Sequence, residues 1–184
     1  MPYYMLRNSP QERRGITADP RLQPPVSFQT GATITSPLPQ PLVFAVDTTA
    51  QEPPADYVRY KIPVFSDRLI KAFETAGVDN LQVFPAKLEN ARTGETWEQF
   101  KAVNIIGLIS CLAIAESRAS PELPPLYSFD LADLVVEDAR IGDAPLFRLA
   151  ESPSVVLVSS RVGDLIMDST DNFRGLEFRD VGSV

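Results

Sequence analysis

The chain of 184 residues contains no histidine and only one cysteine, Cys111. Without histidine it cannot build a Ser-His-Asp or Cys-His nucleophilic centre, and it lacks the commonest protein ligand for metals. A single cysteine cannot form an intrachain disulfide and leaves no plausible structural zinc site. Cys111 stands in the apolar run IIGLISCLAIA, which predicts a buried thiol that only packs.

Long apolar segments and phosphate-binding loops are also missing. The longest nearly apolar run, residues 105–115, has eleven residues, whereas a membrane-spanning helix needs about 20. The opening MPYYMLRNSP lacks the basic and apolar regions of a signal peptide. No glycine-rich phosphate loop occurs, and basic residues are not interleaved with aromatic ones as in RNA- or DNA-binding segments. We therefore expect a cytoplasmic protein without a cofactor that binds neither nucleic acid nor membrane.

What the chain does contain is an uneven distribution of acid. Its net charge is −7, and residues 121–184, with five arginines and twelve acids, hold all of that imbalance. An acidic surface repels nucleic acid and attracts basic partners, although such charge also serves solubility alone. The first acidic group comprises Asp130, Asp133, Glu137, Asp138 and Asp143, and the second, weaker group comprises Asp164, Asp168 and Asp171.

The first sixty residues hold ten of the seventeen prolines. Proline fixes φ and removes a hydrogen-bond donor, so helices and central strands are disfavoured there. Residues 8–41 are predicted to be a long loop, with apolar side chains that pack against the rest of the protein. The chain is accordingly divided into a proline-rich extended arm packed on the body, residues 1–54, and an α+β domain, residues 55–184.

Regular patterns begin after Pro63. Ser66 is a good N-cap for a helix that Gly77 ends, and Ser159 or Ser160 begins a second helix that ends before Gly175. Alternation and turn residues predict an α+β fold, with a mostly antiparallel sheet, two or three helices and the proline-rich N-terminal arm. The predicted strands cover residues 3–6, 42–46, 81–90, 97–106, 134–137, 146–149, 155–158 and 176–178.

Three further segments carry specific expectations. Residues 107–115 fit either a buried helix or a strand, because pattern alone does not separate the two. The tail from Val181 is expected to fray. Arg148 alternates with apolar neighbours in LFRLAES, so it is predicted to point off the core or to pair with an acid.

Several sequence blocks, taken in order, resemble one protein family. The blocks are PVFSDRL, AGVDNLQVFPAKL, a TGE hairpin, VNIIGLISCL, LFRLAESPS and GLEF. They resemble the bacterial immunity proteins of polymorphic toxin systems, a family typified by a myxobacterial protein and earlier described as a domain of unknown function. The similarity covers roughly residues 55–180, and residues 1–54 match mainly through Tyr3–Leu6. The chain departs at residues 109–111, where the family's GLVDAL-like block has an acid.

The resemblance implies a non-catalytic protein, encoded beside a toxin, that binds this cognate toxin and blocks its active site. Many such toxins are nucleases with basic substrate clefts, and an acidic inhibitor would match them in potential and speed association. The resemblance leaves open whether the protein forms a homodimer. The predicted toxin-facing residues are Asp130, Asp133, Glu137, Asp138, Asp143, Asp164 and Asp168.

Two other functions stay open from the residues alone. The clustered carboxylates allow a metal-dependent enzyme, although they lack the fixed spacing of a motif such as the EF-hand loop. The proline-rich arm allows a scaffold or oligomerisation module in which the arm docks onto another subunit.

Overall fold

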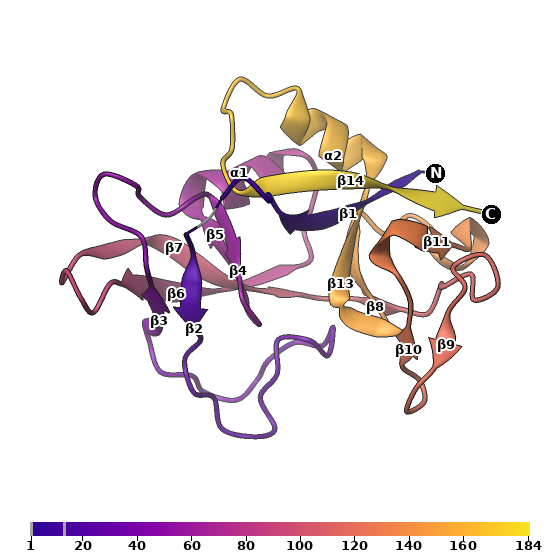
Figure 1. The fold of residues 1–184 in the computed structure, drawn as a ribbon, viewed down its shortest axis with the longest axis horizontal. Coiled ribbons are helices and arrows are strands. Elements are labelled where there is room, and N and C mark those ends of the chain that lie inside the picture. The colour runs from indigo at the N-terminus through magenta and orange to yellow at the C-terminus, as the bar shows by residue number, and fades with distance from the viewer. Residues whose placement is uncertain (1, 13) are drawn as a thin grey trace.

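Two mixed β-sheets form the frame of the computed structural model, which describes residues 2–12 and 14–184 (Figure 1). The β1 sheet has the order β11 (Val135–Val136), β14 (Leu176–Ser183), β1 (Tyr3–Asn8), β13 (Ser152–Ser159), β12 (Leu146–Leu149) and β8 (Leu108–Ile109). The β6 sheet has the order β2 (Ile16–Ala18), β3 (Leu42–Val46), β6 (Leu81–Glu89), β7 (Thr96–Ile105), β5 (Pro63–Ser66) and β4 (Tyr57–Arg59). A small ribbon joins β9 (Ser120–Pro121) to β10 (Tyr127–Ser128).

The helices are few and short. The described residues contain two α-helices, α1 (Asp67–Thr75) and α2 (Ser160–Met167), and two single-turn 3-10 helices, η1 (Leu131–Asp133) and η2 (Asp138–Arg140). The start of α1 follows from its sequence, since the Ser66 hydroxyl accepts a hydrogen bond from the Leu69 amide at 3.3 Å. Neither α-helix in this part of the chain has the length and hydropathy needed to cross a bilayer.

The α+β class is confirmed, and eight of the eleven strand pairings among the described residues are antiparallel, but the expectation of one sheet is wrong. There are two sheets, and among the described strands the pairs β3–β6, β11–β14 and β12–β8 are parallel. Alternation of apolar residues shows which face of a strand is buried, but it does not select the neighbouring strand. The number of sheets and the three parallel pairings were therefore not predictable from the sequence pattern.

The central core lies between the two sheets and beneath both helices. In Figure 1 both helices lie on the same side of the molecule, and α1 contacts α2 directly. Because side chains alternate along a strand, each sheet also has an outer face. Residues 109–144 cover the outer face of the β1 sheet, and residues 22–38 cover that of the β6 sheet. The central core includes Leu6, Phe65, Phe73, Val103, Val156, Val158, Val162 and Ile166.

The N-terminal residues take part in both sheets. Strand β1 lies between β13 and β14 and pairs antiparallel with each. Residues 19–41 contain no helix or strand, yet Phe28 is buried there and Leu22, Ile34 and Leu38 pack beside it. The division of the chain into an arm, residues 1–54, and a domain stays a prediction.

Two of the local expectations have clear outcomes. Residues 107–115 form neither a helix nor a long strand, because only β8 and an isolated bridge between Leu112 and Val136 occur there. The expectation that the tail frays is wrong, since β14 continues to Ser183. Val181 pairs with Tyr3 of β1, and the Gly182 amide donates to the Leu134 carbonyl at 3.1 Å. These partners come from distant parts of the chain, which local sequence cannot reveal.

Candidate interaction surfaces

The described residues offer little reactive chemistry. Cys111 is buried, as predicted, and burial, with a smaller contribution from the Glu151 carboxylate, raises its pKa to about 12. Among residues 2–12 and 14–184, no three His, Cys, Asp or Glu side chains gather closely enough to hold a metal ion.

The first acidic group lies around η1 and η2, beside β11. Asp130 caps η1 by accepting a backbone hydrogen bond at 2.8 Å. Two further members are already paired with arginine: Asp133 lies 3.7 Å from Arg118, and Glu137 lies 2.7 Å from Arg140. Two of the five negative charges predicted here are thus paired within the protein.

The remaining members of the first group, Asp138 and Asp143, lie close enough to the Tyr3 hydroxyl to affect it electrostatically. Burial raises the pKa of the Tyr3 hydroxyl, and the carboxylates of Asp138 and Asp143 raise it further. The Tyr3 hydroxyl donates to the Gly142 carbonyl at 3.3 Å. Tyr3 therefore faces the side of the β1 sheet that η1 and η2 cover.

The second acidic group lies on and after α2, over the other face of the β1 sheet. The hydroxyl of Tyr4 donates to the Asp164 carboxylate at 2.7 Å. Tyr3 and Tyr4 are consecutive in β1, so their side chains point to opposite faces of the sheet. The two predicted acidic groups consequently lie on opposite faces, and one flat partner surface cannot cover both.

The acids of α2 oppose the dipole of their own helix. Asp164 lies in its second half, Asp168 is the C-cap, and the last turn contains no basic residue. A helix C-terminus carries partial negative charge, so acids there are unfavourable by a few tenths to about 1 kcal/mol each. The helix dipole therefore does not account for their position, although Asp164 gains the hydrogen bond from Tyr4.

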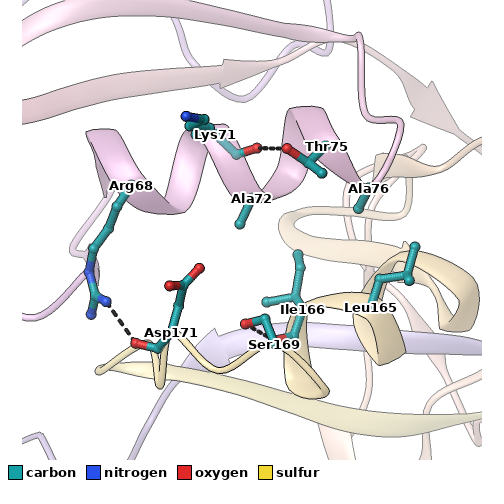
Figure 2. A pocket seen from close by; sticks show the side chains of 9 residues that line it. All are labelled: Arg68, Lys71, Ala72, Thr75, Ala76, Leu165, Ile166, Ser169 and Asp171. Atoms are coloured by element: carbon teal, nitrogen blue, oxygen red, sulfur yellow. Dashed lines mark hydrogen bonds between the residues drawn. The ribbon is translucent and has the colours of Figure 1, made fainter.

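A groove of about 430 Å³ runs between α1 and α2. Figure 2 shows Ala72 of α1 and Ile166 of α2 pointing toward each other across it. Leu165, which is 54% exposed, lies on its α2 side. The other lining residues are Arg68, Lys71, Thr75, Ala76, Ser169 and Asp171.

A second hollow lies on the other side of α2. Its volume is about 190 Å³, and Met167 of α2, Phe173 of the following loop and Phe178 of β14 line it together with other residues. Met167 is 50% exposed. Neither Leu165 nor Met167 is among the predicted toxin-facing residues. The available signal was that both lie off the buried stripe of α2.

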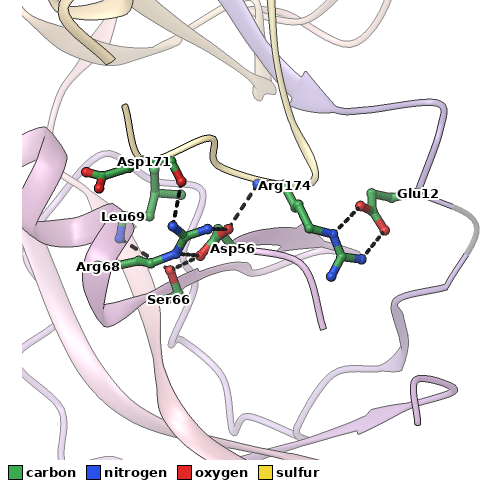
Figure 3. Close-up of polar contacts among 7 residues, drawn as sticks. All are labelled: Glu12, Asp56, Ser66, Arg68, Leu69, Asp171 and Arg174. Atoms are coloured by element: carbon green, nitrogen blue, oxygen red, sulfur yellow. Dashed lines mark hydrogen bonds and ion pairs between the residues drawn. The ribbon is translucent and has the colours of Figure 1, made fainter. Parts of the chain in front are cut away.

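A network centred on Asp56 joins α1 to the loop after α2 (Figure 3). Its carboxylate accepts hydrogen bonds from the Ser66 hydroxyl at 2.7 Å, from Arg68 Nε at 2.6 Å and from the Arg174 amide at 2.9 Å, and it also contacts Arg68 Nη2. Arg68 Nη1 donates in addition to the Asp171 carbonyl at 2.7 Å. The network fixes one end of the α1–α2 groove.

The match with known families decides the membership of the chain. The model described as the immunity protein family (Imm11) matches residues 2–183. The chain belongs to the Imm11 immunity protein family. No curated protein matches it. Membership implies that it neutralises a toxin of a polymorphic toxin system, and immunity proteins of this family are generally non-catalytic.

The Imm11 match covers more of the chain than the sequence blocks did. It begins at residue 2, so strands β1, β2 and β3 all lie within the part that the family shares. The block LFRLAESPS forms β12, a turn and the start of β13. In this Imm11 protein the block builds the β1 sheet.

Arg148 in this block departs from its expectation. It neither points off the core nor pairs with an acid, because its residue is only 1% exposed and Nη1 donates to the Pro153 carbonyl at 2.7 Å. Its Nε and Nη2 have no hydrogen-bond partner among the described residues. Burial lowers the pKa of Arg148 to about 10. Arg148 lies on the same face of β12 as Leu146, within the core between the two sheets. Alternation along the sequence does not show whether a given face of a strand meets the core or solvent.

Proposed function

We propose that this Imm11 protein binds its cognate toxin directly and covers a basic active site with an acidic surface. The observation that supports this proposal most strongly is the placement of charge. The entire net charge of −7 comes from residues 121–184, and two acids of the second group, Asp164 in the second half of α2 and Asp168 at its C-cap, lie toward the helix end that disfavours them. Acids that the helix dipole disfavours and that make no ion pair among the described residues are available for a partner of opposite sign.

The proposal has a kinetic consequence. A negative inhibitor surface and a positive substrate cleft attract each other before contact, which raises association rates by about 10- to 1,000-fold at low salt. Neutralising the acids should lower the association rate and weaken its dependence on salt, with less effect on dissociation. We also propose a cytoplasmic location, since one free cysteine suits a reducing compartment.

Co-expression with the product of the adjacent gene tests the proposal. We expect that product to arrest growth alone, and to co-purify with the immunity protein when growth is rescued. The mass of the complex distinguishes a 1:1 assembly from one built on a homodimer. Inhibition of the purified toxin should be competitive with its substrate, because an inhibitor that covers the active site excludes substrate.

Charge variants make the test specific. Asp133, Asp143, Asp164 and Asp168 are exposed, and they are replaced together by asparagine. The control replaces three exposed acids outside residues 121–184, Glu74→Gln, Asp79→Asn and Glu98→Gln. Slower association of the first variant alone supports an acidic contact surface. Equal rates for both variants, or inhibition that substrate does not relieve, would contradict the proposal.

A further inference from the structure

We infer that α2 is the ridge on which the toxin docks, and that it receives a lysine or arginine of the toxin flanked by two apolar side chains. This inference rests on the function proposed above and selects between the two acidic groups. It depends on the arrangement of charge, exposed apolar side chains and hollows around one short helix.

The centre of the ridge is a pair of acids. Asp164 and Asp168 are four residues apart, so they lie on one face of the helix, and both are exposed. Neither makes an ion pair within the described residues. Tyr4 holds the Asp164 carboxylate through its hydrogen bond of 2.7 Å. The pair thus offers partly oriented acceptors to an incoming cation, whereas Asp133 and Glu137 of the first group already pair with arginines.

An exposed apolar side chain accompanies each flank of the ridge. Leu165 lies at the α1–α2 groove of about 430 Å³, and Met167 lies at the hollow of about 190 Å³ beside β14. Anchor side chains at protein interfaces typically fill such hollows, and methionine adapts its shape to what it meets. Two apolar side chains of the partner, one in each hollow, would bracket the cation over the acids.

The charges around the groove favour a basic partner. Arg68 is neutralised by Asp56, so it does not repel a cation as a free guanidinium would. Asp171 adds negative charge at the groove, while Lys71 is a lining residue that opposes it. A toxin segment with a lysine or arginine between two apolar side chains therefore matches both the sign and the shape of this surface.

The test measures affinity for the adjacent gene product, purified as a catalytically inactive variant. We expect Leu165→Ala, Met167→Ala and the double variant Asp164→Asn/Asp168→Asn each to weaken binding about tenfold or more. Matched controls change the first acidic group and its exposed apolar neighbours: Leu123→Ala, Leu131→Ala and Asp133→Asn/Asp143→Asn. These controls should bind within about threefold of the wild type, as surface substitutions outside a hot spot do.

A filling variant gives an independent reading. Ala72→Phe places a larger side chain in the groove and leaves every exposed charge and apolar side chain of α2 unchanged. We expect this variant to bind the toxin more weakly, and thermal melting confirms that it is folded. If the controls weaken binding and the α2 variants do not, the toxin docks on the first acidic group, so the inference is overturned while the proposed function stands. Wild-type affinity in every variant overturns the inference and also the acidic contact surface, while direct binding of the toxin stands. A toxin that does not bind the wild-type protein removes the proposed function, and the inference with it.

Discussion

Replacing Asp56 with alanine should destabilise the whole protein, because this carboxylate joins three separate segments. Asp56 is buried, and it accepts hydrogen bonds from Ser66 at the start of α1, from Arg68 within α1 and from the Arg174 amide after α2. Alanine would leave the buried Ser66 hydroxyl and the Arg174 amide without their acceptor. It would also release the Arg68 guanidinium from the position that Figure 3 shows.

The magnitude follows from the burial of each donor. A buried donor left without a partner costs about 1–3 kcal/mol, which applies to Ser66 and, less fully, to the Arg174 amide. The Arg68 side chain is 49% exposed, so it regains water and its pair contributes at most about 1 kcal/mol. The expected loss is about 4 kcal/mol in the free energy of unfolding, which corresponds to about 10 °C in Tm for a chain of this size.

The same network makes stability depend on acid. Burial alone would raise the pKa of Asp56, but the hydrogen bonds from Arg68, Ser66 and the Arg174 amide together lower it below its usual value of 3.8. A lowered folded-state pKa contributes stability that is complete above the unfolded pKa and is lost as the pH falls through the folded value. The difference between wild type and Asp56→Ala should therefore be constant near neutral pH and should narrow below about pH 4.

Thermal melts of wild type, Asp56→Ala and Asp171→Ala across this pH range provide the measurement. Asp171→Ala is the matched control, since Asp171 holds Arg68 through its backbone carbonyl, which alanine retains. Asp56→Asn should fall between wild type and Asp56→Ala, because the amide keeps one acceptor and loses the charge. A Tm for Asp56→Ala close to that of the control, or a difference that grows on acidification, would refute the reasoning.

Three further predictions concern backbone space, thiol access and buried charge. Gly175 has a φ of +79°, and a Cβ there would lie 2.6 Å from the Cβ of Ala55. Gly175→Ala should therefore lower the free energy of unfolding by about 3 kcal/mol or more, whereas Gly94→Ala should lower it by about 1 kcal/mol. Gly94 has a similar φ of +76° with open space around it, so thermal melts of the two variants separate strain from clash. Because it is buried, Cys111 should resist iodoacetamide in the native protein and react fully after denaturation. Mass spectrometry measures the labelling, and label on the native protein would contradict the burial of this thiol. Arg148→Met should be at least as stable as wild type, because it removes a buried charge at similar volume. Arg148→Ala should lower the free energy of unfolding by about 3 kcal/mol, because it leaves a cavity. Chemical denaturation measures both variants, and an alanine variant more stable than the methionine variant would count against this account.

The elements with local signals were predicted well. Strands at residues 42–46 and 146–149 have the predicted bounds, and Ser66 begins α1 as expected. Strand β4 escaped prediction because its three residues are too few to show an alternating pattern. The β1 strand was found at Tyr3–Leu6, but its interior place in the sheet was not.

The candidate surface was predictable only in part. The acids of the second group were found from their charge, and the apolar residues Leu165 and Met167 beside them were missed. Their importance depends on two hollows, one against α1 and one against β14, that form only when distant segments pack around α2. Helical spacing separates exposed from buried positions, but it does not show what lies beside an exposed side chain.

The sequence by itself determined the α+β class, most helix and strand positions, the missing histidine chemistry and the concentration of acid after residue 120. These properties depend on composition and on periods of two or 3.6 residues, which a few neighbours establish. The tertiary structure alone decided that two sheets form, that Arg148 is buried between them and that the acidic groups lie on opposite faces. The contacts behind the last decision join Tyr3 to Gly142 and Tyr4 to Asp164, residues 139 and 160 positions apart. Such pairings depend on how the whole chain packs, and no local pattern records them.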